Sequence, residues 1–117
     1  MVRWLRLALL SFALASCTPG TTKDFESPVS ACQSIGSAYC MRLSQCQPGV
    51  DVDTCTTQYE NYNNCDAHSC GTNIYSPAAA QQCYNDTLAL DCPNLEAGNF
   101  PQSCAASAIC LSPDAGP

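Results

Sequence analysis

The chain has 117 residues, of which 11 are cysteine, and its 10 acidic residues outnumber its 4 basic ones. An acidic chain of this size excludes a basic nucleic-acid-binding surface, a polybasic membrane patch and a large catalytic fold such as a barrel. These counts indicate one small, cysteine-dense domain, for which we predict no nucleic-acid partner and no cofactor.

Residues 1–16 have the pattern of a targeting segment. Arg3 and Arg6 flank the start of a short apolar run that is too short to span a bilayer. The run ends in Leu14-Ala15-Ser16-Cys17, which is similar to the lipobox of bacterial lipoproteins. That resemblance implies cleavage before Cys17 and acylation of its thiol and its amine. The alternative interpretation is an ordinary secretory signal followed by a cysteine by chance.

Two further features favour lipidation of Cys17. Lasting membrane anchorage takes more than one acyl chain, which a lipidated and acylated cysteine would carry. An odd number of cysteines leaves one thiol unpaired in an oxidising compartment, whereas setting Cys17 aside leaves ten. The next residue is Thr18 and not Asp, which the sorting rule of many Gram-negative lipoproteins associates with the outer membrane. We therefore predict a lipid-anchored cell-envelope protein on the periplasmic or surface face of the outer membrane.

The chain beyond the signal peptide divides into three predicted parts. Residues 17–27 are the lipidated cysteine and a flexible tether. Residues 28–110 are the folded domain, and residues 111–117 are a loose tail. This exported portion has only Lys23 and Arg42 as bases, so its formal charge is −8.

Helical spacing dominates the domain. The first predicted helix begins at Ser27-Pro28, an N-cap followed by proline, and ends before Pro48-Gly49. Its apolar stripe recurs every three or four residues, at Cys32, Ile35, Tyr39, Leu43 and Cys46.

Two more helices and a short turn follow. The second helix begins at Asp51 and the third at Ser76-Pro77, which repeats the first start signal. Their stripes are Val52, Cys55, Tyr59 and Tyr62, and then Ala80, Cys83, Tyr84, Thr87 and Leu88. The third ends near residues 91–93, and a short fourth turn covers residues 101–110. No run alternates at period two, so the prediction is an all-α domain of three to four helices stapled by disulfides.

The apolar supply explains the need for disulfides. The exported chain has 14 Val, Ile, Leu, Met and Phe residues and five Tyr. Burial of a large apolar side chain gains about 1.5–3 kcal/mol, whereas ordering one residue costs about 1.5 kcal/mol. Each disulfide adds about 2–4 kcal/mol. We predict that ten cysteines form five disulfides of open connectivity: Cys32, Cys40, Cys46, Cys55, Cys65, Cys70, Cys83, Cys92, Cys104 and Cys110.

One segment carries a candidate metal or thiol site. Cys65 and Cys70 enclose His68, the only histidine of the chain. A closed zinc site needs a fourth ligand, and thiols in an oxidising compartment pair with each other. We therefore predict disulfides here and no metal, with a Cys65-His68-Cys70 site as the less favoured alternative. No Gly-x-Ser-x-Gly sequence occurs, and no other nucleophile has an evident base.

The domain resembles small cysteine-rich lipoproteins of myxobacteria and their relatives, whose function is unassigned. The resemblance is carried by Tyr39-Cys40-Met41-Arg42-Leu43-Ser44-Gln45-Cys46, Asp53-Thr54-Cys55, Ser76-Pro77, Cys83, Cys92 and Asn99-Phe100-Pro101-Gln102-Ser103-Cys104. It implies a helical disulfide domain on a lipid anchor. It implies no activity, and it carries over no functional residue.

These features favour a non-enzymatic structural or interaction module, held at the membrane by its lipid anchor. Its acidic surface would contact an envelope or extracellular protein. The alternative is a periplasmic small-ligand carrier, although the small supply of apolar residues predicts no sizeable pocket. We expect the tyrosines of the helical stripes in the core. Tyr75 lies in a predicted loop beside Ile74, and it would mark a binding surface if it is exposed.

Overall fold

The structure is a computed structural model that describes residues 24–113. The predicted signal peptide, the lipidation site Cys17 and the end of the predicted tail lie outside the described residues. The described chain is helical, as predicted, with one two-stranded sheet. Its elements in chain order are α1 (Pro28–Cys46), α2 (Val52–Asn63), the 3-10 turn η1 (Cys65–Ala67), β1 (Ile74–Tyr75), α3 (Pro77–Leu88), α4 (Cys92–Glu96), the 3-10 turn η2 (Gln102–Cys104), α5 (Ala106–Ile109) and β2 (Cys110–Leu111).

The predicted caps begin the three long helices. The hydroxyl of Ser27 accepts a hydrogen bond from the backbone N–H of Ser30 at 3.1 Å, and the Ser30 hydroxyl accepts one from Ser27 in return. The carboxylate of Asp51 accepts from the backbone N–H of Thr54 at 2.9 Å at the start of α2. Ser76 caps α3 in the same way. Each cap satisfies donors that have no partner within the helix.

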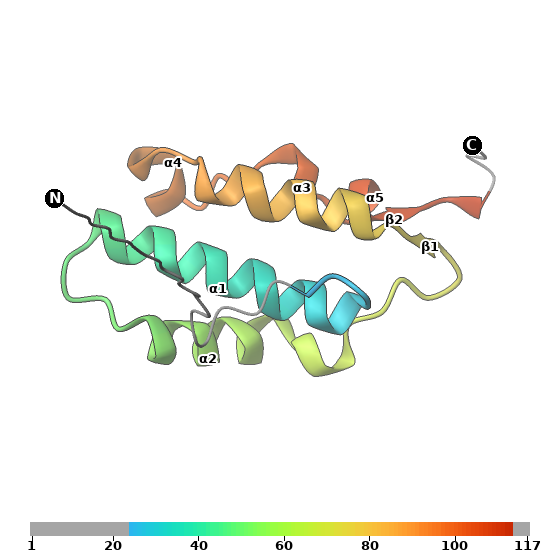
Figure 1. Cartoon of the computed structure of the whole chain (residues 1–117), viewed down its shortest axis with the longest axis horizontal. Helices are drawn as coiled ribbons and strands as arrows, with labels where there is room; N and C mark the ends of the chain where they lie inside the picture. The colour runs from blue at the N-terminus through green and yellow to red at the C-terminus, as the bar shows by residue number, and fades with distance from the viewer. Residues whose placement is uncertain (1–23, 114–117) are drawn as a thin grey trace, which may run out of the picture.

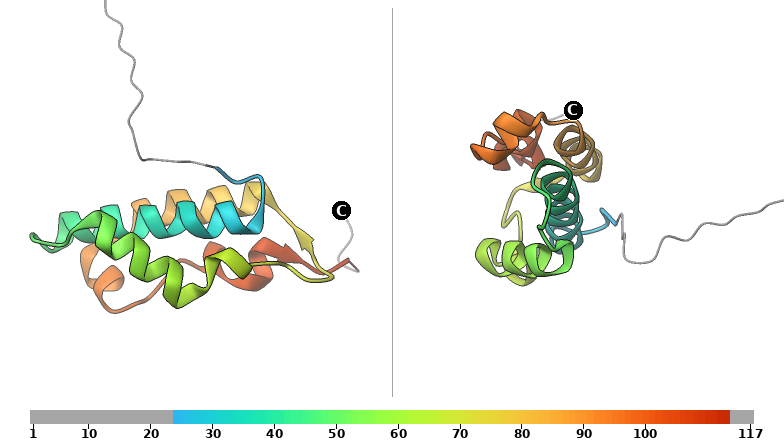
Figure 2. Two further views of the ribbon diagram at one scale, coloured as in Figure 1. Left: turned by 90° about the horizontal axis from the view of Figure 1, so that it is seen from below. Right: turned by 90° about the vertical axis from the view of Figure 1, so that its left-hand side faces the viewer.

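Helix α1 is the centre of the molecule. Figure 1 shows α2 along one side of it and α3 along the other, and the views in Figure 2 agree. After α3 the chain turns back, so that α4, η2 and α5 lie beside α3 and opposite α2. Because α1 packs on two sides, residues outside its predicted stripe, such as Ala38 and Cys40, are fully buried as well.

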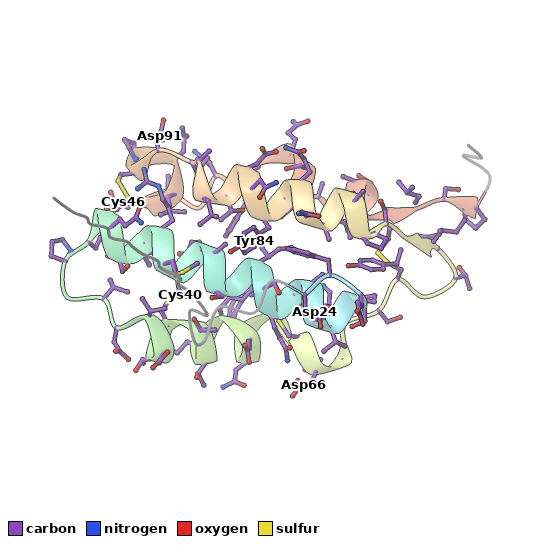
Figure 3. All side chains as sticks on the ribbon, viewed as in Figure 1. Asp24, Cys40, Cys46, Asp66, Tyr84 and Asp91 are labelled. Atoms are coloured by element: carbon purple, nitrogen blue, oxygen red, sulfur yellow. A yellow bond between two sulfur atoms is a disulfide. The ribbon has the colours of Figure 1, made fainter. Side chains whose placement is uncertain are left out.

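The core is small and lies between α1 and α3. Its buried members are Ile35, Ala38, Cys83 and Tyr84, against which Phe25, Cys104 and Ile109 pack. Figure 3 shows Tyr84 in this layer. The rings of Phe25 and Tyr84 meet edge to face, with centroids 5.5 Å apart, an arrangement that aromatic pairs favour.

The structure extends the domain beyond the predicted boundaries. Asp24 and Phe25, placed in the predicted tether, contact the domain, since the Asp24 N–H donates to Ser34 Oγ at 3.1 Å. Leu111, placed in the predicted tail, pairs with Ile74 in the antiparallel β1–β2 ladder. Two-residue strands are too short to show alternation, which is why the sequence predicted no sheet. Helix α4, capped by Asp91, is a separate element that we had not predicted.

Within residues 24–113, no helix combines the length and the apolar character that a bilayer crossing requires.

Candidate binding groove

The ten cysteines of the domain form five disulfides, as predicted. The bonds are Cys32–Cys65, Cys40–Cys55, Cys46–Cys92, Cys70–Cys110 and Cys83–Cys104. Three of them start from α1 and reach η1, α2 and α4. Figure 3 labels two of the α1 cysteines, Cys40 and Cys46. Of the other two, one joins α3 to η2, and the other joins the segment that precedes β1 to strand β2. Three bonds thus fasten α1 to its neighbours, and the other two fasten later segments of the chain to one another.

This pairing removes the thiols of the alternative metal site. Cys65 and Cys70 belong to different disulfides, so neither can supply a thiolate. Asp66, labelled in Figure 3, and His68 are both exposed. Among the described residues, no group of three or more His, Cys, Asp or Glu side chains is placed to hold a metal ion.

A groove of about 910 Å³ runs along α1 between two walls. Its floor is the face of α1 that carries Ala31, Cys32, Ile35 and Tyr39. One wall is α2 with the following turn, and the other is the returning C-terminal segment. The wall residues are Cys55, Gln58, Tyr59, Tyr62, Asn63 and His68 on one side and Phe100, Pro101, Gln102, Cys104, Ala105 and Ile109 on the other. The predicted stripe of the first helix therefore lines a groove and not only a core.

Three aromatic rings connect the two walls across the floor. The ring centroid of Tyr39 lies 5.8 Å from that of Tyr59 and 5.3 Å from that of Phe100. Tyr39 thus contacts α2 on one side and the C-terminal wall on the other. Tyr62 lies further along α2 and is 91% exposed, although we had expected it in the core. The sequence predicted that Tyr62 lies on a helix, but it did not predict where the C-terminal wall across the groove would lie.

The wall formed by α2 rests directly on the backbone of α1. A methyl group at Gly36 would overlap the Tyr59 ring, so the missing side chain allows this close approach. Burial, and secondarily the neighbouring Tyr39, raise the pKa of Tyr59 above its ordinary value. Burial opposes ionisation because a phenolate loses its hydration in this position.

The polar groups of the groove are side-chain amides, phenols and the imidazole of His68. Asn63 donates from Nδ2 to the carbonyl of Tyr59 at 2.9 Å, which fixes its side chain at the end of α2. The side-chain amides of Gln58 and Gln102 form no hydrogen bond with any other described residue. No acidic or basic side chain of residues 24–113 apart from His68 lines the groove, and its cysteines are all in disulfides. The lining offers apolar contact and hydrogen bonds, but no nucleophile with a base.

The opposite face of α1 differs in chemistry. A smaller cleft of about 410 Å³ lies there, between α1 and α2, and serines at positions 30, 34 and 37 line it. Asp24, Asp53 and Glu60 also line it. Ser34 is buried, and its hydroxyl donates to the carbonyl of Asp24 at 3.0 Å. The described chain therefore enters the domain on the side of α1 away from the groove (Figure 2).

Tyr75 lies outside the groove. It is half-buried, and its hydroxyl donates to the carbonyl of Phe25 at 2.7 Å. Burial, and secondarily Asp24, raise the pKa of Tyr75. It thus fastens the entering chain, whereas the exposed aromatics of the groove are Tyr62 and Phe100. For Phe100 the sequence held no helical signal, because the residue lies in a loop.

The chain matches no protein-family model, no curated protein and no solved structure.

Proposed function

We propose that the protein is a lipid-anchored module of the cell envelope that binds a partner and catalyses no reaction. The observation that carries the proposal is the completeness of the disulfide pairing. The sequence has eleven cysteines, and all ten in the described domain are paired. The remaining one is Cys17, which follows Leu14-Ala15-Ser16.

Both halves of this observation support export. Five disulfides persist in an oxidising compartment and are rare in the cytosol. A single cysteine outside the disulfide set has a chemical use if its thiol carries a lipid. More than one acyl chain on that residue would give lasting anchorage. The groove supports a binding role, because its lining supplies contact surface and hydrogen bonds without a catalytic pair.

The test compares the natural chain with Cys17→Ser in a Gram-negative host. We expect the natural chain in the outer-membrane fraction, with an intact mass that includes acyl chains and no thiol that alkylates before reduction. Cys17→Ser should be soluble and keep all five disulfides. Cys17 left as a free thiol, or equal membrane recovery of the two proteins, would contradict the anchored role.

A periplasmic small-ligand carrier is the second candidate. The groove of about 910 Å³ favours it, although the count of apolar residues had predicted no sizeable pocket. A carrier is expected to retain its ligand through purification. Native mass spectrometry of the protein from its host would reveal a bound small molecule, and a mass equal to that of the lipidated chain alone would count against the carrier.

A further inference from the structure

The groove holds no carboxylate and no Lys or Arg side chain of the described residues, although the domain is strongly acidic. Besides His68, residues 24–113 hold nine acidic side chains and Arg42, and of all these only His68 lines the groove. Arg42 is engaged elsewhere, donating from Nε to the carbonyl of Leu90 at 2.8 Å. An anionic ligand would meet the negative field of the domain, and a cationic one would find no carboxylate in the groove. Charge therefore favours a neutral occupant.

Exposed aromatic rings stand on the two facing walls. Tyr62 is 91% exposed on the α2 wall, and Phe100 is 44% exposed on the C-terminal wall. Each ring presents a flat apolar face, and large aromatic side chains in a concave surface are typical anchors of a binding site. A ligand that is itself flat and apolar on its faces would bury both rings.

The amides of the groove specify hydrogen-bonding groups at the ligand's edges. Gln58 and Gln102 lie on opposite walls. Each amide supplies both a donor and an acceptor, which matches hydroxyl groups, since a hydroxyl also donates and accepts. A pyranose ring combines these properties, because its faces carry C–H groups and its edges carry hydroxyls.

Other occupants fit the groove less well. A peptide strand needs an unpaired strand edge, but β1 and β2 do not line the groove. A helical peptide has its backbone groups satisfied internally and would leave the amides unmatched.

We propose that the groove binds a chain of neutral pyranose sugars, which stacks on Tyr62 and Phe100 and is hydrogen-bonded by Gln58 and Gln102. The floor from Pro28 to Leu43 extends about 22 Å at about 1.5 Å per residue, so several linked sugar units would lie along α1. The inference rests on the proposed binding module and names the chemistry of its partner.

The experiment uses the full chain, purified in detergent from an exporting Gram-negative host, and isothermal titration calorimetry. The probes are cellohexaose and hexa-N-acetylchitohexaose, which are neutral, with hexagalacturonate as the anionic counterpart. We expect at least one neutral hexamer to bind and the anionic one not to bind. Tyr62→Ala should raise Kd about tenfold, and Gln58→Ala with Gln102→Ala should weaken binding as well. Since Tyr62 is 91% exposed, its removal should leave the fold intact.

Two variants provide the controls. Tyr62→Phe keeps the ring and should bind with nearly the natural affinity. Ile74→Ala removes an apolar side chain that is 56% exposed outside the groove and should leave Kd unchanged.

Several outcomes would overturn the inference. They are no binding of either neutral hexamer, equal binding of the anionic hexamer, or an unchanged Kd in Tyr62→Ala. A dimer that depends on Tyr62 in sedimentation, without sugar binding, would assign the groove to a second copy and overturn it too. Fractionation tests the proposed membrane anchor independently of sugar binding. Protein recovered without lipid would contradict the anchor, and the titration would still test the groove.

Discussion

The two faces of α1 show how one helix serves opposite purposes. The face with Ala31, Ile35 and Tyr39 forms the floor of an aromatic groove. The opposite face carries serines at positions 30, 34 and 37 in an acidic cleft, where Asp24 brings the chain into the domain. The Cys40–Cys55 and Cys83–Cys104 disulfides hold the two walls beside an apolar stripe that a small core cannot cover. Altering each face should therefore affect different properties.

Removing the disulfide behind the C-terminal wall should have the largest effect on binding at the groove. In Cys83→Ala with Cys104→Ala, the wall loses its bond to α3, and Cys83 is fully buried. A loop of this size is worth about 3 kcal/mol, so the free energy of unfolding in urea should fall by about that amount. Binding at the groove should be lost as well.

The matched control is Cys46→Ala with Cys92→Ala. This bond joins α1 to α4 and lies outside the groove. The control should lose stability and retain groove binding. If the two double variants weaken binding equally, the C-terminal wall is not held specifically by the Cys83–Cys104 bond.

Gly36→Ala should disturb the other wall. The new methyl group would overlap the Tyr59 ring, and overpacking of this kind typically costs about 1–3 kcal/mol. Urea unfolding should show that loss, and the ultraviolet absorption of tyrosine should change as Tyr59 becomes more exposed. Ser37→Ala on the opposite face should change stability by less than about 0.5 kcal/mol. Equal stabilities of the two variants would contradict the close contact of α2 with α1.

Ser34→Ala tests the face on which the chain enters. The Ser34 hydroxyl both accepts from and donates to the backbone of Asp24. Losing this pair of hydrogen bonds should cost about 1 kcal/mol and speed amide hydrogen exchange at Asp24, with sugar binding unchanged. Gln33→Ala, on the same face, serves as the control. A loss of sugar binding in Ser34→Ala would show that the two faces are coupled.

The smallest effect concerns alkaline pH. The fold raises the pKa of Tyr59, so the native state holds this proton more tightly than the unfolded chain. Its contribution to stability is complete below the ordinary tyrosine pKa of about 10 and is lost as pH rises through the higher native value. Absorbance at alkaline pH should show phenols ionising later in the native than in the denatured protein. Tyr59→Phe should remove part of that delay, and an unchanged curve would contradict the burial of Tyr59.

The helices were predictable because their signals are local. Ser27-Pro28, Asp51 and Ser76-Pro77 mark helix starts by side-chain hydrogen bonds that reach only three residues along the chain. The need for disulfides was predictable from the shortage of apolar residues. The disulfide pairs were not, because each joins segments 15 to 46 residues apart, and spacing alone does not choose among them.

The groove was beyond prediction for a related reason. The sequence marked Tyr39 and Tyr59 as apolar stripe positions, and such positions cover a core or line a groove according to what packs against them. That choice depends on Phe100, which returns from a loop far along the chain to reach Tyr39. The count of large side chains failed to predict the space because the groove is lined by a few of them together with amides and with disulfide cysteines at positions 32, 55, 83 and 104.

The order of the disulfides has a consequence for what a protease can do to the molecule. A single cut in the exposed Gln47–Gly49 loop leaves two fragments joined by three bonds, because Cys32, Cys40 and Cys46 all pair with later residues. A cut near Gly71 leaves Cys46–Cys92 and Cys70–Cys110 as links. A cut near Gly98 leaves Cys83–Cys104 and Cys70–Cys110. The molecule can therefore be nicked once in any of these three loops and remain one covalent body.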